Sequence, residues 1–429
     1  MRKFSIVSIL MLLMLAIVPL TVMGQDDDTV TIMANWGGPE QVGFEAVLAA
    51  FTEETGIEVE FISDRDSEIT VQTMIAAGNP PDILHMPRPG VAAEFARDGV
   101  ILPLTSGDDP IIPMELLTDN YSQGIIDQGM VDGEIYGVLH APNSKSTIWY
   151  RTDTFADLDL EIPETWEELI ELTEILQEEG IPPIAMGGLD GWTLTDWFEN
   201  IYVRVAGPEM YTGLFVTHEV EWTDPTVVEA MELFRDLITP TDDRLLGGSE
   251  GALATDFIGG MDQMLRGEAG LYYEGGFMSG SGEQNFPDMT CGEDFSFFTF
   301  PAINEEWGSP VVGGGGLWLV FNDNPNVREL IRYLVSPEAL TVWLTQEEGA
   351  RLPASFNVDS SIVPSACNQL EAAQIAGAEI FVFDGSDLAP GAVGGDAMFT
   401  GLQNFISNPD DIDGVLEFIE GVADTAYSD

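Results

Sequence analysis

The chain from residue 29 to residue 98 alternates between the two-residue period of strands and the 3.6-residue period of helices. In chain order the pattern predicts a strand over 29–36, a helix over 39–55, a strand over 57–62, a helix over 67–77, a strand over 82–86 and a helix over 90–98. Such alternation is typical of an α/β unit with a mainly parallel sheet. Ligands of these sheets bind outside the carboxyl ends of the strands. The loops that meet this condition are 35–40, 65–66 and 86–90.

The second part of the chain carries similar signals. Thr165 and Glu168 have the spacing of a capping box, which predicts the start of a helix. The apolar run over 295–300 is typical of a strand. We expect the chain to return to the first α/β unit at this run and to leave it again near Leu352.

The N-terminus has the layout of a secretory signal peptide. Arg2 and Lys3 precede an apolar run over 6–20, and small or neutral residues lead to Gln25. We therefore predict residues 1–24 as a cleaved signal and the protein as periplasmic or extracellular. An uncleaved membrane anchor stays open as the alternative, because the apolar stretch is nearly long enough to span a bilayer.

The charge balance is strongly acidic. The chain has 14 basic and 74 acidic residues, a formal net charge of −60, and 45% hydrophobic residues. Such a surface repels nucleic acid and anionic lipid, which excludes a binder of polyanions. The apolar content is sufficient for a core, and the length is typical of two or more domains. The acidity indicates adaptation either to high salt, which screens repulsion, or to low pH, which protonates carboxylates.

The two cysteines are Cys291 and Cys367. An even number of cysteines in a secreted protein predicts one disulfide bond, with a metal-binding pair as the weaker alternative.

Sequence motifs of enzymes and metal sites are absent or incomplete. The chain has no G-x-S-x-G, H-E-x-x-H or Walker A sequence. The three histidines, His85, His140 and His218, have no His or Cys within four residues. The segment 411–420 matches a calcium loop only in part, since Pro409 occupies the position of its first ligand. We predict no catalytic residue, no metal and no cofactor.

One lysine stands out in the segment 135–151. Lys3 and Lys145 are the two lysines of the chain, and Lys3 lies in the predicted signal peptide. Lys145 follows Pro142 in a polar break between two strand-like runs. A lone lysine among so many carboxylates indicates a specific role, although a solvated surface position is the alternative.

Several segments together resemble the sugar-binding proteins of ABC importers, in particular the maltose-type and α-glucoside-type solute-binding proteins. The segments that carry the resemblance are NWGGPEQVGFEAVLAAFTEETGIEVEF, IAAGNPPDILHMPRPG, YGVLHAPNSKSTIWYRTDTF, PETWEEL, GEAGLYYEGGFM, FFTFPAI and FDGSDLAPGAVGG. Each segment is unspecific alone, but their order extends over nearly the whole mature chain.

The resemblance implies the type II periplasmic-binding-protein fold, with two α/β lobes around mixed sheets that close on a ligand. We expect lobe 1 to comprise 25–139 and 296–350, and lobe 2 to comprise 140–295 and 351–429. The implied function is capture of a carbohydrate, an α-glucoside or oligosaccharide, by a monomer that delivers it to a permease with a separate ATPase. A solute-binding protein for a non-sugar ligand is the main alternative, and a secreted enzyme that acts on glycosides is a weaker one.

The loop positions and the resemblance together predict the ligand-binding residues. They are Trp36, Glu40, Arg65, Pro87, Arg88, Lys145, Trp192, Asp196, Gly276, Phe277, Trp318, Asp384 and Asp387. Aromatic rings pack on the C–H faces of sugars, and charged groups bind their hydroxyls. Arg88 departs from the family pattern, in which a neutral polar residue is more usual, so an acidic or substituted glycoside becomes possible.

Overall fold

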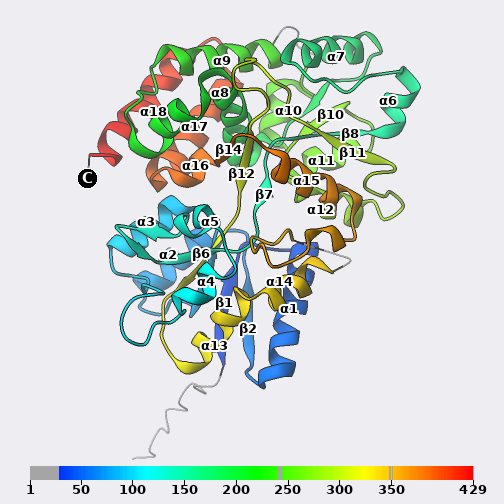
Figure 1. The fold of residues 1–429 in the computed structure, drawn as a ribbon. Helices are drawn as coiled ribbons and strands as arrows, with labels where there is room; N and C mark the ends of the chain where they lie inside the picture. Colours follow the sequence, from blue (N-terminus) through cyan, green and yellow to red (C-terminus); the bar gives the residue numbers. More distant parts are fainter. Residues whose placement is uncertain (1–28, 240–243, 347–348, 350, 429) are drawn as a thin grey trace, which may run out of the picture.

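The structure, a computed structural model, describes residues 29–239, 244–346, 349 and 351–428. The predicted signal peptide, residues 1–24, lies outside the described residues. The chain folds into two lobes that are joined by extended segments (Figure 1). Each lobe has a sheet flanked by helices, so the predicted two-lobed α/β fold is confirmed. No helix in the described ranges is both long and apolar enough to cross a membrane.

A five-stranded sheet forms the centre of the first lobe. Its strands in spatial order are β2 (Val59–Ser63), β1 (Val30–Ala34), β3 (Ile83–Met86), β13 (Leu317–Val320) and β6 (Gly137–Leu139). β1 pairs in parallel with β2 and β3, whereas β13 is antiparallel to β3 and β6. The sheet is mixed because β13, which a later part of the chain supplies, runs antiparallel to the strands on both of its sides.

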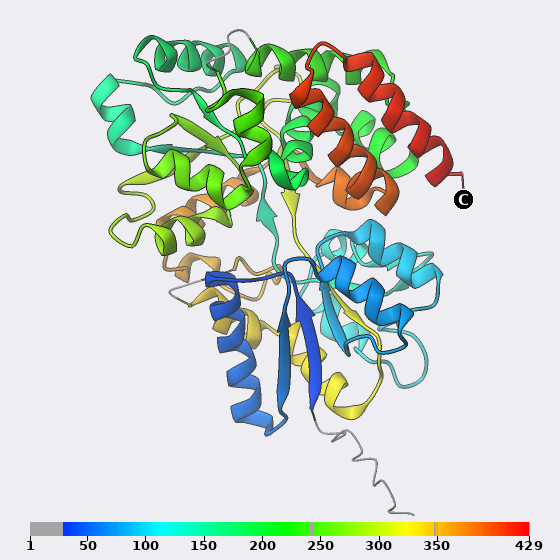
Figure 2. The same cartoon turned by 180° about the vertical axis from the view of Figure 1, so that it is seen from behind.

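Helices cover both faces of this sheet (Figure 2). They are α1 (Pro39–Thr55), α2 (Ser67–Ala76), α3 (Pro89–Arg97), α4 (Met114–Thr118), α5 (Gln123–Asp127), α13 (Pro325–Leu334) and α14 (Pro337–Leu344). Ile32 packs into a hydrophobic cluster with residues of α1 and α14, whereas Met33 packs into a second cluster with residues of α2 and α3. Consecutive strand residues point to opposite faces, so this lobe has a core on each side of its sheet. A hairpin of β4 (Met130–Val131) and β5 (Glu134–Ile135) precedes β6.

A four-stranded sheet forms the centre of the second lobe. Its strands in spatial order are β11 (Phe295–Thr299), β8 (Thr147–Arg151), β10 (Leu271–Tyr273) and β9 (Ile184–Ala185). The helices of this lobe are α6 (Thr152–Leu158), α7 (Trp166–Glu178), α8 (Trp192–Thr212), α9 (Pro225–Ile238), α10 (Gly248–Ala254), α11 (Phe257–Leu265), α12 (Met278–Asn285), α15 (Ala366–Gly377), α16 (Gly385–Leu388), α17 (Met398–Ser407) and α18 (Ile412–Ala426). Shorter helical segments are η1 (Gly188–Asp190), η2 (Gly213–Thr217), η3 (Ser360–Ile362) and η4 (Ala392–Ala397).

Local sequence signals set several helix boundaries. α1 begins at Pro39 and buries Phe44, Val47, Leu48 and Phe51, whose spacing of three and four residues places them on one face of the helix. Gly56 ends this helix in the left-handed conformation, with φ of 74°. At the start of α7 the Thr165 hydroxyl accepts a hydrogen bond from the Glu168 N–H, and the Glu168 carboxylate accepts one from the Thr165 N–H. The predicted capping box is therefore confirmed.

The chain returns to the first lobe later than the sequence predicts. β11 pairs with β8 along its whole length, so residues 295–299 still belong to the sheet of the second lobe. Leu352 and Val363 pack into the core of the first lobe, so the chain also leaves that lobe later. The expected lobe boundaries at 296 and 351 are wrong in these two places. An apolar run indicates a buried strand, but its spacing does not reveal the strand with which it pairs.

A small sheet lies at the junction of the lobes. β12 (Val311–Gly314) is parallel to β14 (Phe381–Phe383) and antiparallel to β7 (Asn143–Ser144). β7 and β12 run between the lobes near the centre of Figure 1. Gly313 lies so close to the ring of Phe381 that a Cβ atom has no room there. The glycine run before β13 thus permits close packing at the crossing.

The predicted disulfide bond is present between Cys291 and Cys367, whose Cα atoms are 5.7 Å apart. It joins the segment before β11 to helix α15. Since α15 follows the last crossing from the first lobe, the disulfide holds the returning chain on the second lobe.

The partial calcium-loop pattern over 411–420 does not form a loop. Residues 412–426 form helix α18, so the carboxylates of this segment are distributed around a helix. The weak interpretation of this segment as a calcium loop is wrong, in agreement with the missing first ligand.

Candidate functional site

Lys145 lies where the chain passes from β7 into β8 of the second lobe. Its backbone N–H donates to the Val312 carbonyl at 2.8 Å. Its carbonyl oxygen accepts hydrogen bonds from Asn200 Nδ2 at 2.8 Å and from the Tyr273 hydroxyl at 2.6 Å. The backbone of this residue is therefore fixed between the junction sheet and the core of the second lobe.

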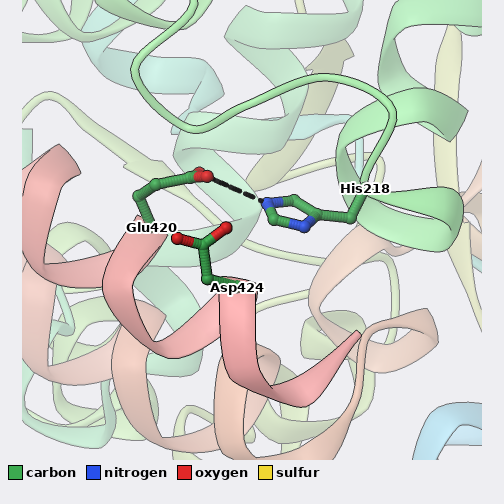
Figure 3. A group of neighbouring side chains, drawn as sticks. All are labelled: His218, Glu420 and Asp424. Atoms are coloured by element: carbon green, nitrogen blue, oxygen red, sulfur yellow. Dashed lines mark hydrogen bonds and ion pairs between the residues drawn. The ribbon is translucent and has the colours of Figure 1, made fainter. Parts of the chain in front are cut away.

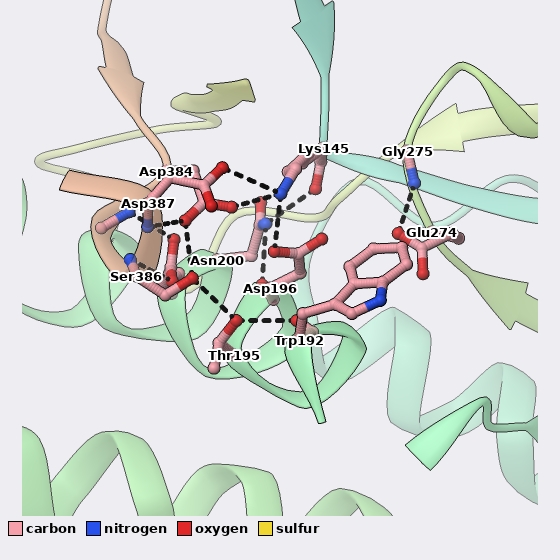
Figure 4. A network of polar contacts seen from close by, with 12 residues as sticks. Lys145, Trp192, Thr195, Asp196, Asn200, Glu274, Gly275, Asp384, Ser386 and Asp387 are labelled. Carbon is pink, nitrogen blue, oxygen red and sulfur yellow. Dashed lines mark hydrogen bonds and ion pairs between the residues drawn. The ribbon is translucent and has the colours of Figure 1, made fainter. Parts of the chain in front are cut away.

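The ammonium group of Lys145 lies among three aspartates (Figure 4). Nζ is 3.2 Å from Asp196 Oδ1 and 3.6 Å from Asp387 Oδ2, and it also forms an ion pair with Asp384. Asp196 lies near the start of α8, whereas Asp384 caps α16 and Asp387 lies within it. The structure thus brings four of the predicted site residues together from three distant segments. The alternative of a solvated surface position for Lys145 is excluded, because the residue is buried.

Burial and the charges within the cluster have opposing effects on its acid–base properties. Burial alone lowers the pKa of Lys145, but the combined attraction of Asp196, Asp384 and Asp387 raises it well above its usual value. Burial raises the pKa of Asp196, whereas for Asp384 the charge and hydrogen bond of Lys145 outweigh burial and lower the pKa. Burial and the neighbouring Asp384 raise the pKa of Asp387 to about 7. Lys145 and Asp384 are therefore the firmly charged pair.

Glu199 holds the start of α16 in place. Its carboxylate accepts hydrogen bonds from the N–H groups of Gly385 at 2.7 Å and Ser386 at 2.9 Å, and from the Tyr211 hydroxyl at 2.8 Å. Oxygen atoms of Asp196, Glu199 and Asp384 lie within 4.8 Å of one another, an arrangement that suits a cation. The Lys145 ammonium contacts two of these three carboxylates and supplies that positive charge.

Arg88 brings the first lobe to the same cluster. Its Nη1 is 3.2 Å from both carboxylate oxygens of Glu68, and its Nε is 4.0 Å from Asp387 Oδ1. Pro87, half-buried, separates Arg88 from the end of β3. Because two carboxylates already compensate the guanidinium, Arg88 gives no support for an acidic ligand, in contrast to the expectation from its unusual identity.

Trp192 is the aromatic residue of the predicted set that borders this cluster. It is partly exposed at the first position of α8, and Lys145 Nζ lies 5.6 Å from the centroid of its ring. The ring of Phe277 is 6.2 Å away between centroids. The backbone N–H of Gly276 donates to the Ser144 carbonyl at 2.8 Å, and Gly276 leaves no room for a Cβ atom beside Glu371.

Trp36 and Trp318 do not face the cleft. Their exposed fractions are 3% and 0%, and their ring centroids are 5.6 Å apart within the core of the first lobe. Trp36 also packs on His85, at 4.1 Å between centroids. Both residues lie beside glycine-rich loops, which suggested the cleft, but their rings turn into the hydrophobic core. Neither ring is available to a ligand in this structure.

A second group of predicted residues lies on the side of the junction nearer α1 and α12. Glu40 forms ion pairs with Arg65, at 3.0 Å, and with Arg351. The Arg65 guanidinium lies 5.6 Å from the ring centroid of Phe257 in the other lobe. Glu40 and Phe277 both line a cavity of about 40 Å³ between the lobes.

Several residues of the site were not predicted from the sequence. Glu274 is fully buried beside Asp196, and burial raises its pKa to about 8, so its carboxyl carries a proton at neutral pH. It directly follows β10 and precedes Gly275. A polar residue directly after a strand is the signal that predicted the ligand-binding loops of the first lobe, and it could have identified Glu274 as well. Asn143 and Glu371 line the cavity, but neither residue carries a comparable signal in the sequence.

Glu371 makes the stability of the protein depend on pH. Its Oε1 accepts a hydrogen bond from the Ser144 N–H at 2.8 Å, yet burial raises its pKa from 4.5 to about 7. Between these two values the folded protein keeps a proton that the unfolded chain has lost, so stability falls as the pH rises. The unfolding free energy of the natural protein should fall between pH 5 and pH 8. In Glu371→Gln we expect this fall to be smaller by roughly 2–3 kcal/mol.

Denaturant titrations of both proteins at the two pH values measure this effect. Glu379→Gln, on an exposed residue just beyond the same helix, is the control and should retain the pH dependence of the natural protein. An equal pH dependence of Glu371→Gln and the natural protein would contradict the assignment.

Comparisons with known proteins agree with this architecture. Residues 37–341 match the family described as bacterial extracellular solute-binding protein. The chain is 33% identical over 392 residues to the osmoprotective compounds-binding protein GgtB of Synechocystis sp., with 90% of each chain covered. It is 33% identical over 401 residues to the alpha-glucosides-binding periplasmic protein AglE of Rhizobium meliloti, with 90% of this chain and 85% of the relative covered.

Solved structures show the same fold at low sequence identity. The bacterial solute receptor AcbH superimposes with a TM-score of 0.81 at 19% identity, over 93% of this chain and 99% of that receptor. The maltose-maltodextrin binding protein of Alicyclobacillus acidocaldarius superimposes with a TM-score of 0.70 at 18% identity, over 92% of this chain and 100% of that protein. The predicted type II binding-protein fold is confirmed. The chain belongs to the family of bacterial extracellular solute-binding proteins.

Proposed function

We propose that the protein captures a neutral, hydroxyl-rich carbohydrate between its lobes and delivers it to the permease of an ABC importer. The observation that carries this proposal is a set of buried polar atoms without a hydrogen-bond partner in the described chain. Those at the junction of the lobes are Arg88 Nη2 and Asn143 Oδ1. Buried polar atoms are costly unless they are paired, and sugar hydroxyls both donate and accept.

The aromatic residue beside the Lys145 cluster supports the same ligand class. Trp192 is partly exposed, and Asp196 and Glu274 lie on either side of its ring in Figure 4. A ring with carboxyl groups at its edge offers an apolar face to C–H groups and acceptors to hydroxyls. The names of the two relatives, which refer to alpha-glucosides and to osmoprotective compounds, are compatible with a polyhydroxylated solute. We therefore favour an α-glucoside, with another small osmoprotective solute as the alternative.

The charge of the site argues against an anionic ligand. Lys145 and Arg88 are its cations, and both already contact carboxylates. Asp196, Asp384 and Asp387 surround the Lys145 ammonium, and Glu68 and Asp387 lie at the Arg88 guanidinium, so the charge of each cation is already compensated. A ligand carboxylate or phosphate would therefore find no uncompensated cation, whereas a neutral sugar needs none.

Closure of the lobes is the proposed mechanism of capture. In this structure the Gly391 N–H of the second lobe donates to Glu94 of the first lobe at 2.8 Å. Because each lobe supplies part of the site, a ligand binds the closed form better and shifts the equilibrium toward it. We propose that the closed protein then docks on the permease outside the cytoplasmic membrane, while a separate ATPase supplies energy. No bond of the ligand changes in this mechanism.

Calorimetry with a panel of α-linked di- and trisaccharides, amino acids and a uronic acid tests the ligand class. We expect α-glucosides to bind and the uronic acid not to bind. Trp192→Ala should weaken sugar binding at least about tenfold, because the apolar face is lost. Trp307→Ala is the control, since this half-buried tryptophan lies on the second lobe outside the cleft. Binding of amino acids alone, or equal affinity of the Trp192 variant, would contradict the proposal, and a hydrolysed sugar would favour an enzyme.

A substitution at Gly90 tests whether the lobes close on the ligand. A Cβ atom at this position in α3 would lie 2.7 Å from the Leu388 carbonyl oxygen of the second lobe and closer still to that of Ala389. Gly90→Ala should therefore obstruct the closed form while leaving the separated lobes intact. We expect affinity for the sugar to fall at least about tenfold, and the ligand-induced decrease in radius of gyration to disappear in solution scattering.

The control for this variant is Gly124→Ala in α5, where a Cβ atom meets open space. It should bind and close as the natural protein does. Sugar affinity of Gly90→Ala equal to that of the control would show that the contact between α3 and α16 is not part of the binding-competent form.

A further inference from the structure

A second group of polar side chains lies on the second lobe, away from the cleft. It consists of His218, Glu420 and Asp424 (Figure 3). His218 follows η2, and the two carboxylates lie four residues apart on α18, which places them on the same face of that helix. Glu420 lies 202 residues from His218 in the chain. Because the fold brings the three side chains together from distant segments, no local spacing in the sequence indicates a metal site at His218.

The geometry of the group suits a small divalent ion. His218 Nε2 is 3.3 Å from Glu420 Oε1, and one donor atom from each of the three residues lies within 4.8 Å of the others. Two ligands of a tetrahedral zinc ion, with bonds of about 2.0–2.1 Å, are separated by about 3.3 Å. The imidazole and the first carboxylate are therefore already at the required spacing, and the exposed Asp424 has room to adjust.

Neighbouring groups hold two of the three ligands in position. The Trp222 N–H donates to Glu420 Oε2 at 2.7 Å, and both oxygens of this carboxylate lie 3.3 Å from His218 Nε2. The ring of His218 stacks on Tyr427, at 4.9 Å between centroids, and the Tyr427 hydroxyl donates to the Phe215 carbonyl at 2.6 Å. The side chains of His218 and Glu420 are only 10% and 14% exposed. Ligands that are oriented by their surroundings bind a metal more tightly than freely rotating ones.

We propose that His218, Glu420 and Asp424 form a binding site for a divalent transition-metal ion, with Zn²⁺ as the best match. One imidazole nitrogen with two carboxylate oxygens suits zinc, whereas calcium and magnesium favour ligand sets of oxygen alone. Water would complete the coordination. The ion would replace the direct contact between His218 and Glu420 and would join the segment after η2 to the C-terminal helix. This site is independent of the sugar-binding proposal.

Calorimetry with ZnCl₂ and CaCl₂ on the purified protein, free of any histidine tag and treated with a chelator, tests the site. We expect one Zn²⁺ ion per chain, bound at least tenfold more tightly than Ca²⁺. His218→Asn should weaken zinc binding at least tenfold. His218 has φ of 52°, a conformation that asparagine tolerates, so this variant should fold. Zinc should also raise the thermal midpoint of the natural protein and leave that of the variant unchanged.

Two further variants complete the test. Asp424→Asn removes the exposed ligand without touching the packed histidine and should also weaken zinc binding. Glu417→Gln changes an exposed carboxylate on the same helix outside the group and should not. Equal zinc affinity of the natural protein and both ligand variants would overturn the proposal, as would zinc binding no tighter than calcium binding.

Discussion

A buried ammonium group among carboxylates is the interaction on which the junction of the lobes and the site both depend. Lys145 lies at the end of the junction strand β7, and its partners Asp196, Asp384 and Asp387 come from two helices of the second lobe. Removal of one partner from a buried ion pair is strongly destabilising, because the other charge remains without compensation. The lysine therefore fixes the path of the chain at the point where the ligand is proposed to bind.

The two lobes contribute differently to the proposed site. The second lobe is preassembled, because Glu199, Asn200 and Tyr273 hold the backbone and the charged groups in place. The first lobe adds Arg88 and a few backbone contacts, and these depend on closure. Such a division is suited to capture, since one lobe can bind first and the other can complete the enclosure.

Short-range sequence patterns predicted many of the helices and strands. The features that depend on contacts between distant segments could not be predicted from such patterns. The helix that begins at Pro39 and the capping box at Thr165 follow from short-range spacing. Lys145 was notable because lysine is so rare in this chain, and the resemblance supplied its aspartate partners. The lobe to which β11 belongs, the inward turn of the Trp36 ring and the approach of Glu420 to His218 depend on residues far apart in the chain. The spacing of residues within one segment contains no information about those contacts.

A double-mutant cycle on unfolding free energy tests the central role of the buried ammonium most directly. Lys145→Met should lower the free energy of unfolding by about 3–5 kcal/mol, because it leaves buried carboxylates without their cation. In the double variant with Asp384→Asn, the total loss should be smaller than the sum of the two single losses, since the uncompensated charge of the firmly charged partner is removed. Strictly additive effects, or an unchanged stability of Lys145→Met, would contradict the account.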